Sequence, residues 1–103
     1  MSRFAGRVAL ITGGSRGIGK AIAEAFAKEG AAVSIVDINK EALDATIKEF
    51  REKGYTVHAE VADVVNRDQA ENAVNNTVEK FGRIDILVNN AGVTRDNLLF
   101  KMT

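Results

Sequence analysis

Short apolar runs alternate with amphipathic stretches through most of this 103-residue chain, and this alternation restricts its fold more than any other feature. The first run, residues 7–12, is rich in strand-forming residues and ends at a glycine pair, which is typical of a strand buried on both faces. Further strands are predicted at 32–36, 55–61 and 84–88. Apolar residues at helical spacing predict helices from 18 to about 29, about 39 to 53, and 66 to 81.

The predicted order is βαβαβαβ, in which each helix returns the chain to begin another strand in the same direction. Such crossovers are right-handed and produce a parallel sheet with helices on both faces. The sequence therefore predicts an α/β fold with about four parallel strands in the order 3-2-1-4. Asn39 is a candidate cap of the second helix, and Gly30, Gly54 and Gly82 are candidate helix stops.

A glycine-rich turn, TGGSRGIG at residues 12–19, lies where the first strand leads into the first helix. The first N–H groups of a helix are unpaired and its dipole is positive at that end, so a pyrophosphate can bind there. Glycine also permits a tight turn, close approach of the backbone to phosphate, and close packing of the helix on the strand. The structural alternative is a turn that simply requires positive φ.

Two kinds of nucleotide loop compete for this turn. Residues 14–20 fit the opening of a G-x-x-x-x-G-K-[ST] loop, but residue 21 is Ala, so the hydroxyl that such a loop offers to Mg²⁺ is missing. A dinucleotide site is therefore favoured over an ATP or GTP site. Lys20 is then expected to be a solvated helix residue.

The predicted second strand ends at Asp37, 18 residues after Gly19. This is close to the offset of about 20 residues at which an acidic side chain binds the adenosine ribose. The carboxylate would repel a 2′-phosphate and so favours NAD, whereas the Arg16 guanidinium could pair with that phosphate in NADP. The structural alternative for Asp37 is a cap of the following helix.

The overall composition excludes several partners. Fourteen Lys and Arg balance fourteen Asp and Glu, which leaves no electrostatic footprint for nucleic acid or an anionic membrane. With no cysteine there is no disulfide, thiolate metal site or cysteine nucleophile. The first 14 residues lack the pattern of a secretory signal or membrane span. We therefore expect a cytoplasmic protein without nucleic-acid, membrane or metal partners.

Three motifs together resemble those of the short-chain dehydrogenase/reductase family. They are the glycine turn, Asp63 just after the third predicted strand, and the Asn89–Gly92 segment (NNAG) closing the fourth. The tail from Gly92 to Met102 is similar to that of 3-oxoacyl-acyl-carrier-protein reductases and acetoacetyl-CoA reductases. The resemblance covers nearly the whole chain and implies a Rossmann-like fold in an oxidoreductase that reduces a 3-oxoacyl thioester with a nicotinamide cofactor.

The resemblance also implies which residues bind the cofactor. The glycine turn would hold the pyrophosphate, Asp37 the adenosine ribose, Asp63 and Val64 the adenine, and the segment from Asn90 the ribose and nicotinamide. Asn89 would help to hold strands together. The candidate binding residues are Gly13, Ser15, Arg16, Gly17, Ile18, Gly19, Asp37, Asp63, Val64, Asn90, Ala91 and Gly92. Turn capping by Asp63 and satisfaction of strand ends by the paired asparagines are the structural alternatives.

The catalytic Ser, the Tyr-x-x-x-Lys pair and a further Asn of the family follow the NNAG segment, and this sequence supplies none of them. Its only tyrosine, Tyr55, is followed four residues later by Ala59, and His58 is expected to be an ordinary strand residue. We therefore expect residues 1–103 to be the amino-terminal half of a Rossmann domain, truncated before its catalytic half and inactive alone. The alternative is a folding or designed module without cofactor binding.

The fourth predicted strand, residues 84–88, is apolar yet lies at the sheet edge in the order 3-2-1-4. Unpaired apolar edges recruit further strands. We therefore expect a homo-oligomer, such as a dimer formed by antiparallel pairing of two fourth strands, or else a rearranged topology.

Overall fold

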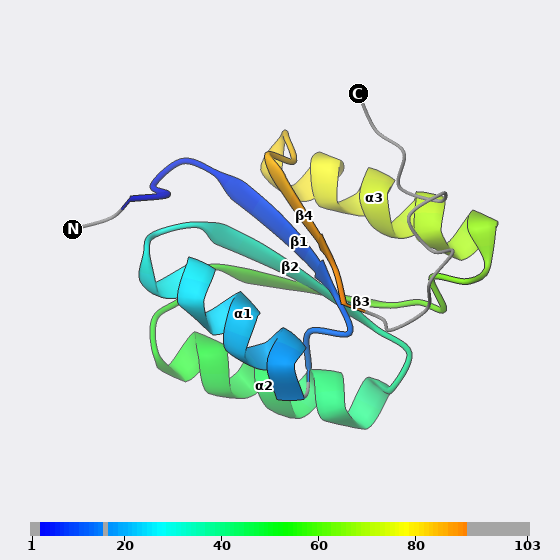
Figure 1. Ribbon diagram of the computed structural model, residues 1–103, viewed down its shortest axis with the longest axis horizontal. Helices are drawn as coiled ribbons and strands as arrows, with labels where there is room; N and C mark the ends of the chain where they lie inside the picture. Colours follow the sequence, from blue (N-terminus) through cyan, green and yellow to red (C-terminus); the bar gives the residue numbers. More distant parts are fainter. Residues whose placement is uncertain (1–2, 16, 91–103) are drawn as a thin grey trace.

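Four parallel strands and three helices make up the part of the chain that the computed structural model describes, residues 3–15 and 17–90 (Figure 1). The strands follow the order β3-β2-β1-β4, which confirms the predicted topology. Along the chain the elements are β1 (Val8–Thr12), α1 (Gly17–Lys28), β2 (Ala32–Asp37), α2 (Lys40–Glu52), β3 (Val57–Val61), α3 (Arg67–Phe81) and β4 (Ile86–Asn89). The order reverses between β1 and β4.

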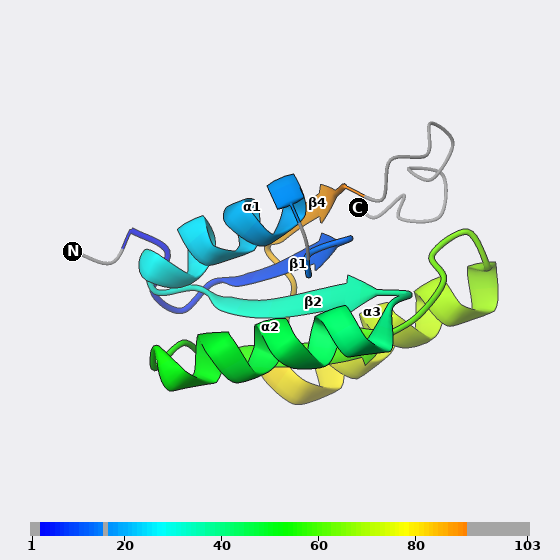
Figure 2. The ribbon, with the colours of Figure 1, turned by 90° about the horizontal axis from the view of Figure 1, so that it is seen from below.

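Helices cover both faces of the sheet, as predicted, with α1 and α2 on one face and α3 on the other (Figures 1 and 2). Successive strand residues point to opposite faces. Ile11 of β1 therefore packs with Leu43 and Phe50 of α2, whereas its neighbour Leu10 packs with Ala70 of α3. All five residues of β1 are buried, which explains why this strand is a continuous apolar run.

Local capping sets the helix ends. The Asn39 and Asn66 side chains accept backbone N–H groups at 2.9 and 3.1 Å and cap α2 and α3. Gly82 ends α3 in the left-handed conformation with φ 87°. The predicted Asn39 cap and Gly82 stop are thus confirmed. Within the described ranges, no helix is long and apolar enough to cross a membrane.

Two strands begin two residues later than predicted, and in each case a hydrogen bond near the start of the strand accounts for the difference. The Tyr55 N–H closes the end of α2 by donating to the Phe50 carbonyl at 3.0 Å, so β3 begins at Val57. Before β4, the Asp85 carboxylate accepts the Val8 N–H at 2.8 Å. The Val8 N–H is therefore paired with the Asp85 side chain and not with a backbone carbonyl of the neighbouring strand. Regular strand pairing of β4 begins one residue later, at Ile86.

Buried hydroxyl groups tie the sheet to α3. The Thr77 hydroxyl donates to the Ala73 carbonyl of its own helix at 2.8 Å and lies 2.7 Å from the Ser34 hydroxyl of β2. Because the single Thr77 proton is used within the helix, Ser34 is the donor in the second bond. Both residues are fully buried and both hydroxyls are paired, as burial requires.

Candidate functional site

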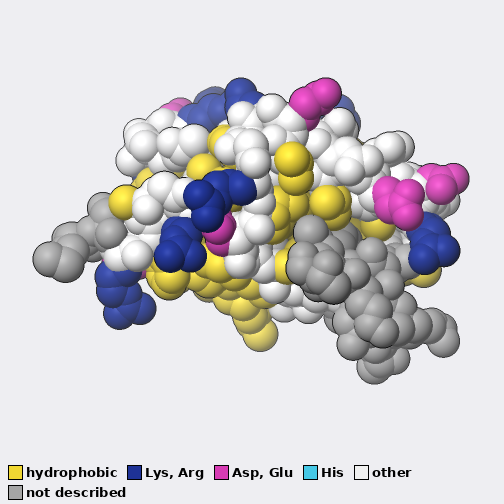
Figure 3. Space-filling view, turned by 90° about the horizontal axis from the view of Figure 1, so that it is seen from above, with side chains coloured by type: hydrophobic (Ala, Val, Ile, Leu, Met, Phe, Trp, Pro, Cys, Tyr) yellow, Lys and Arg dark blue, Asp and Glu magenta, His cyan; other side chains and the backbone are white. Residues whose placement is uncertain are grey.

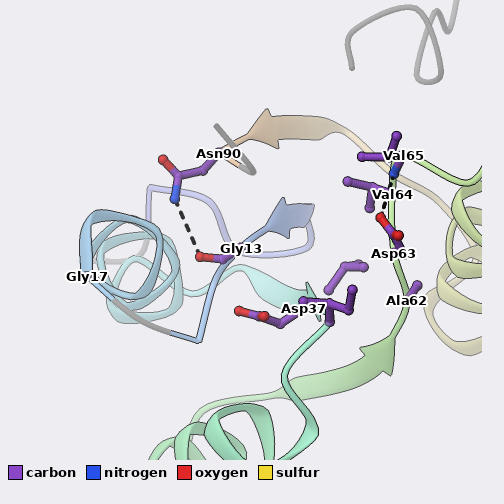
Figure 4. Close-up of a pocket in the computed structure, with 10 residues that line it drawn as sticks. Gly13, Gly17, Asp37, Ala62, Asp63, Val64, Val65 and Asn90 are labelled. Carbon is purple, nitrogen blue, oxygen red and sulfur yellow. Dashed lines mark hydrogen bonds between the residues drawn. The ribbon is translucent and has the colours of Figure 1, made fainter. Parts of the chain in front are cut away.

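A cleft of about 480 Å³ lies at the carboxyl edge of the sheet (Figure 4). Its walls come from the glycine turn, the ends of β2 and β3, and the residue after β4. The lining residues are Gly13, Gly17, Val36, Asp37, Ile38, Ala62, Asp63, Val64, Val65 and Asn90. The cleft therefore lies where the strand order reverses, which is the usual ligand site of an open α/β sheet.

The glycines of the turn have different structural roles. Gly13 and Gly17 have φ values of 66° and 56°, a region that residues with a Cβ rarely adopt. A Cβ on Gly17 would meet no atom of the described residues within 4 Å apart from its chain neighbours and the backbone of its own helix, which leaves space beside this cleft residue. A Cβ on Gly19 would overlap the Gly13 carbonyl oxygen and lie 2.5 Å from the Asn90 side-chain nitrogen. Gly19 therefore allows close packing of α1 on the turn.

The amino-terminal end of α1 is electrostatically suited to an anion. Its first turn, residues 17–20, contains no acidic side chain to compensate the positive end of the helix dipole. Lys20 lies on α1 with its side chain partly exposed to solvent, and it forms an ion pair with Glu49 of α2 at 2.7 Å. Among the described residues, the free N–H groups and the dipole of α1, rather than this lysine, make the turn favourable to negative charge.

The Asp37 carboxylate at the end of β2 is 5% exposed and is tied to the glycine turn. Its Oδ2 accepts the Ser15 backbone N–H at 3.3 Å and the Ser15 hydroxyl, while Oδ1 accepts the Asn39 N–H at 3.0 Å. The N-cap of α2 is Asn39 rather than Asp37. Asp37 thus places a buried, hydrogen-bonded carboxyl group on the cleft wall.

Asp63 follows β3 and lines the cleft. It also caps a turn, which was the structural role weighed against adenine binding. Its carboxylate accepts the Val65 N–H at 3.0 Å (Figure 4). Its own N–H donates to the Gln69 side chain of α3 at 2.7 Å. Adjacent Val64 is buried in the core that α3 covers, so it offers the cleft an apolar wall.

Asn89 and Asn90 tie the end of β4 to β1. The Thr12 hydroxyl donates to the Asn89 side-chain oxygen at 3.0 Å and accepts the Asn90 backbone N–H at 2.9 Å. The Asn90 side chain donates to the Gly13 carbonyl at 3.4 Å (Figure 4). Asn90 therefore both completes the strand ends and connects them to the glycine turn.

The structure brings six of the twelve candidate residues together on the cleft walls: Gly13, Gly17, Asp37, Asp63, Val64 and Asn90. Ser15 is buried beneath the cleft against Asp37, Gly19 packs α1, and Ile18 is 72% exposed on α1 without lining the cleft. Arg16, Ala91 and Gly92 lie outside the described residues. No three His, Asp or Glu side chains gather into a metal site within residues 3–15 and 17–90.

Four apolar residues that line the cleft were not among the predicted residues: Val36, Ile38, Ala62 and Val65. Val36 and Ala62 are buried, whereas the other two are not. Ile38 and Val65 are 63% and 57% exposed, although both are large and hydrophobic. Each follows a candidate cofactor-binding residue at the carboxyl edge, and unlike Val64 neither belongs to the buried core. Their position directly after candidate cofactor-binding residues could have identified them in the sequence. Exposed apolar side chains beside a cleft suit a flat apolar ligand.

A family model for short chain dehydrogenases matches residues 7–103. The chain belongs to the short-chain dehydrogenase family. It is 51% identical over 100 residues to the 3-oxoacyl-[acyl-carrier-protein] reductase FabG of Thermotoga maritima, a match covering 97% of this chain and 41% of that protein. The chain thus spans about two fifths of the length of this relative.

Solved structures of the short-chain dehydrogenase family share the fold. A short chain dehydrogenase from Mycobacterium smegmatis superposes with a TM-score of 0.86 at 37% identity, over 90% of this chain and 40% of that one. A 7α-hydroxysteroid dehydrogenase complexed with NADH gives 0.85 at 38% identity, over 88% of this chain and 36% of that one. Members of the family are oxidoreductases that bind nicotinamide dinucleotides in this Rossmann-like region.

Proposed function

We propose that this chain is the cofactor-binding, amino-terminal half of a short-chain dehydrogenase Rossmann domain and that it prefers NAD. The observation that carries the proposal is the buried Asp37 carboxylate sharing one cleft with Gly17 at the start of α1. An acceptor for ribose hydroxyls thereby lies near a helix end that favours phosphate. The proposed site consists of the twelve candidate residues between Gly13 and Gly92, including Arg16 and Ala91.

The described residues fit a dinucleotide. Open space beside Gly17 leaves room for a pyrophosphate close to the backbone, and Asp37 offers the ribose a charged acceptor. Val64 and its apolar neighbours supply a wall for adenine, while Asn90 lies on the β4 side for the second ribose. When bound, such a cofactor would supply the hydride acceptor or donor of a redox reaction.

The preference for NAD rests on charge. Asp37 is nearly inaccessible to water, and a carboxylate in low-dielectric surroundings repels a 2′-phosphate more strongly than an exposed one would. NADP is the second candidate, because the Arg16 guanidinium could pair with that phosphate. The two cofactors differ only at the ribose, so comparing them isolates this interaction.

The chain contributes binding rather than turnover in this proposal. Reduction of a carbonyl needs a proton donor of suitable pKa, and the sequence contains no Tyr-x-x-x-Lys pair to provide it. We therefore expect the 103 residues alone to be inactive. The parent enzyme would reduce a 3-oxoacyl thioester, a proposal supported by the name of the Thermotoga maritima relative. A cytoplasmic location accords with that activity.

We also propose that the chain self-associates through β4. Among the described strands β4 is an edge, paired only with β1, and its residues Ile86–Val88 are only partly buried. Figure 3, seen from the β4 side, shows hydrophobic side chains gathered in a central band between charged ones. Antiparallel pairing of two such edges would cover the backbone groups and part of this apolar surface.

The cofactor proposal is tested by calorimetric titration of the wild-type chain and the Asp37→Asn variant with NADH and NADPH. Asparagine keeps the shape and one acceptor oxygen but loses the charge. Loss of charge-assisted hydrogen bonds, worth about 1.5–3 kcal/mol, should weaken NADH binding by about 10- to 100-fold. NADPH binding should be unchanged or tighter because the repulsion is removed.

Asp44→Asn is the matched control, since Asp44 is an exposed carboxylate of α2 paired with Lys40 and does not line the cleft. Its affinity for both cofactors should equal that of the wild-type chain. An equal loss of NADH and NADPH affinity in Asp37→Asn would show that Asp37 only supports the turn. Tighter wild-type binding of NADPH would contradict the NAD preference. Binding of neither cofactor would favour the alternative folding module.

A further inference from the structure

Thr46 is a buried residue of α2 that contacts the glycine turn although it does not line the cleft. It is 2% exposed, and its hydroxyl donates to the Ser15 backbone carbonyl at 2.8 Å. The contact joins residues 31 positions apart. It connects the turn at Ser15 to helix α2. Nothing in the cofactor-binding motif itself requires a threonine at this position.

The direction of this hydrogen bond is unusual for a threonine within a helix. Such hydroxyls commonly donate to the carbonyl four residues earlier in the same helix, as Thr77 does to Ala73 at 2.8 Å. Thr46 instead donates its proton out of α2 to another segment. Because a hydroxyl has only one proton, this bond takes the place of the local one.

Ser15 is consequently held at three of its polar groups. Thr46 binds its carbonyl, while its N–H and its hydroxyl both donate to Asp37. A carbonyl oxygen carries partial negative charge and would repel a pyrophosphate if it turned toward the cleft. Thr46 holds this oxygen at α2, and the same hydrogen bond helps to keep Ser15 in place against Asp37.

We propose that Thr46 is a positioning residue that holds the glycine turn in its phosphate-binding conformation. The inference rests on the proposed function, since it concerns the same cofactor site. Loss of the hydroxyl should weaken dinucleotide binding beyond what general destabilisation explains. The apolar wall of the cleft at Val64 is not expected to change, because the Thr46 hydroxyl bonds to the turn and not to that wall.

Three variants test the proposal. Thr46→Val removes the donor at nearly constant volume, and Thr46→Ser retains it. Thr77→Val is the matched control, because Thr77 is also a buried helical threonine with a paired hydroxyl, but it lies on the α3 face away from the cleft. Each variant is titrated with NADH and with ADP below its unfolding temperature. Amide hydrogen exchange is followed at Gly13 and Ser15, whose N–H groups bond to the Val36 carbonyl and to Asp37.

Thr46→Val should raise the Kd for NADH and ADP by about 3- to 10-fold, the loss expected for one net hydrogen bond. Thr46→Ser should bind within about twofold of the wild-type chain. Thr77→Val should bind as the wild-type chain does, although its unfolding temperature falls comparably. Exchange at Gly13 and Ser15 should be faster in Thr46→Val alone.

Equal affinity of Thr46→Val and Thr77→Val for NADH, with unchanged exchange in the turn, would overturn the proposal and leave Thr46 a purely structural residue. If the wild-type chain binds neither NADH nor ADP, the proposed function fails instead. The exchange rates then decide the positioning role by themselves. Faster exchange in the turn of Thr46→Val than of Thr77→Val supports it, and equal rates refute it.

Discussion

Gly17 and Gly82 are a matched pair of glycines for separating binding from stability. Both have positive φ, 56° and 87°. At both, an added Cβ would meet no atom of residues 3–15 and 17–90 within 4 Å apart from its chain neighbours and adjacent helix backbone. Gly17 begins α1 and lines the cleft, whereas Gly82 ends α3 and does not. Alanine at either position therefore meets the same kind of backbone strain, but only one substitution changes the cleft.

The expected magnitudes follow from this geometry. Left-handed backbone costs an L-residue about 1–2 kcal/mol, and the lower entropy of the unfolded alanine chain offsets about 0.4–1 kcal/mol of that cost. Each variant should thus be destabilised by about 1 kcal/mol, or roughly 4–8 °C in Tm for a chain of this size. Gly17→Ala should also weaken NADH binding by at least about tenfold, because the methyl group prevents close approach of the pyrophosphate to the backbone.

The assay measures Tm by circular dichroism and Kd for NADH by calorimetry on both variants and the wild-type chain. Gly82→Ala should lose stability and keep its affinity. The reasoning is refuted if Gly17→Ala binds NADH as tightly as Gly82→Ala does. A much larger loss of Tm in Gly17→Ala would instead show that the turn is chiefly required for folding.

Two further predictions concern the surface of the molecule. Hydrogen bonds from Lys53 to Glu24, and from Lys20 and Lys53 to Glu49, lower the pKa of both carboxyl groups below 4.5. Their contribution to stability is therefore present above that value and should be lost as the pH falls through the lowered pKa values. Thermal unfolding of the wild-type chain and Lys53→Met between pH 7 and pH 3 should show a smaller acid loss in the variant, and an equal loss would contradict this. Sedimentation velocity at high concentration should reveal an oligomer formed through β4, and a strictly monomeric chain would count against that pairing.

Local signals in the sequence were sufficient to predict most of the architecture. Strand β1 is fully buried between two layers of helices, and a strand buried on both faces is apolar along its whole length. It could therefore be predicted from its composition. Asn39 and Gly82 set helix ends through hydrogen bonds to residues at most four positions away. Such short-range contacts can be predicted from the local sequence. The parallel order of the strands then follows from crossover geometry.

Polar contacts between distant segments could not be predicted in the same way. The bonds that Ser15 makes with Asp37 and Thr46 join residues 22 and 31 positions apart, and no periodicity marks them. Thr46 lies on the buried stripe of α2, where its methyl group suits the core as well as its hydroxyl suits the turn. The late start of β4 is another case, because the Asp85 carboxylate that accepts the Val8 N–H lies 77 positions away from Val8.

The most direct test of the account is to follow the backbone amide resonances of the chain by NMR as NADH is added. Saturable shifts are expected at Gly13, Gly17, Asp37 and Asn90, which line one cleft although they come from separate segments. The outer surface of α2 around Lys48 should remain unperturbed. An absence of saturable shifts, or shifts confined to a surface away from the cleft, would contradict the claim that this cleft binds a nicotinamide dinucleotide.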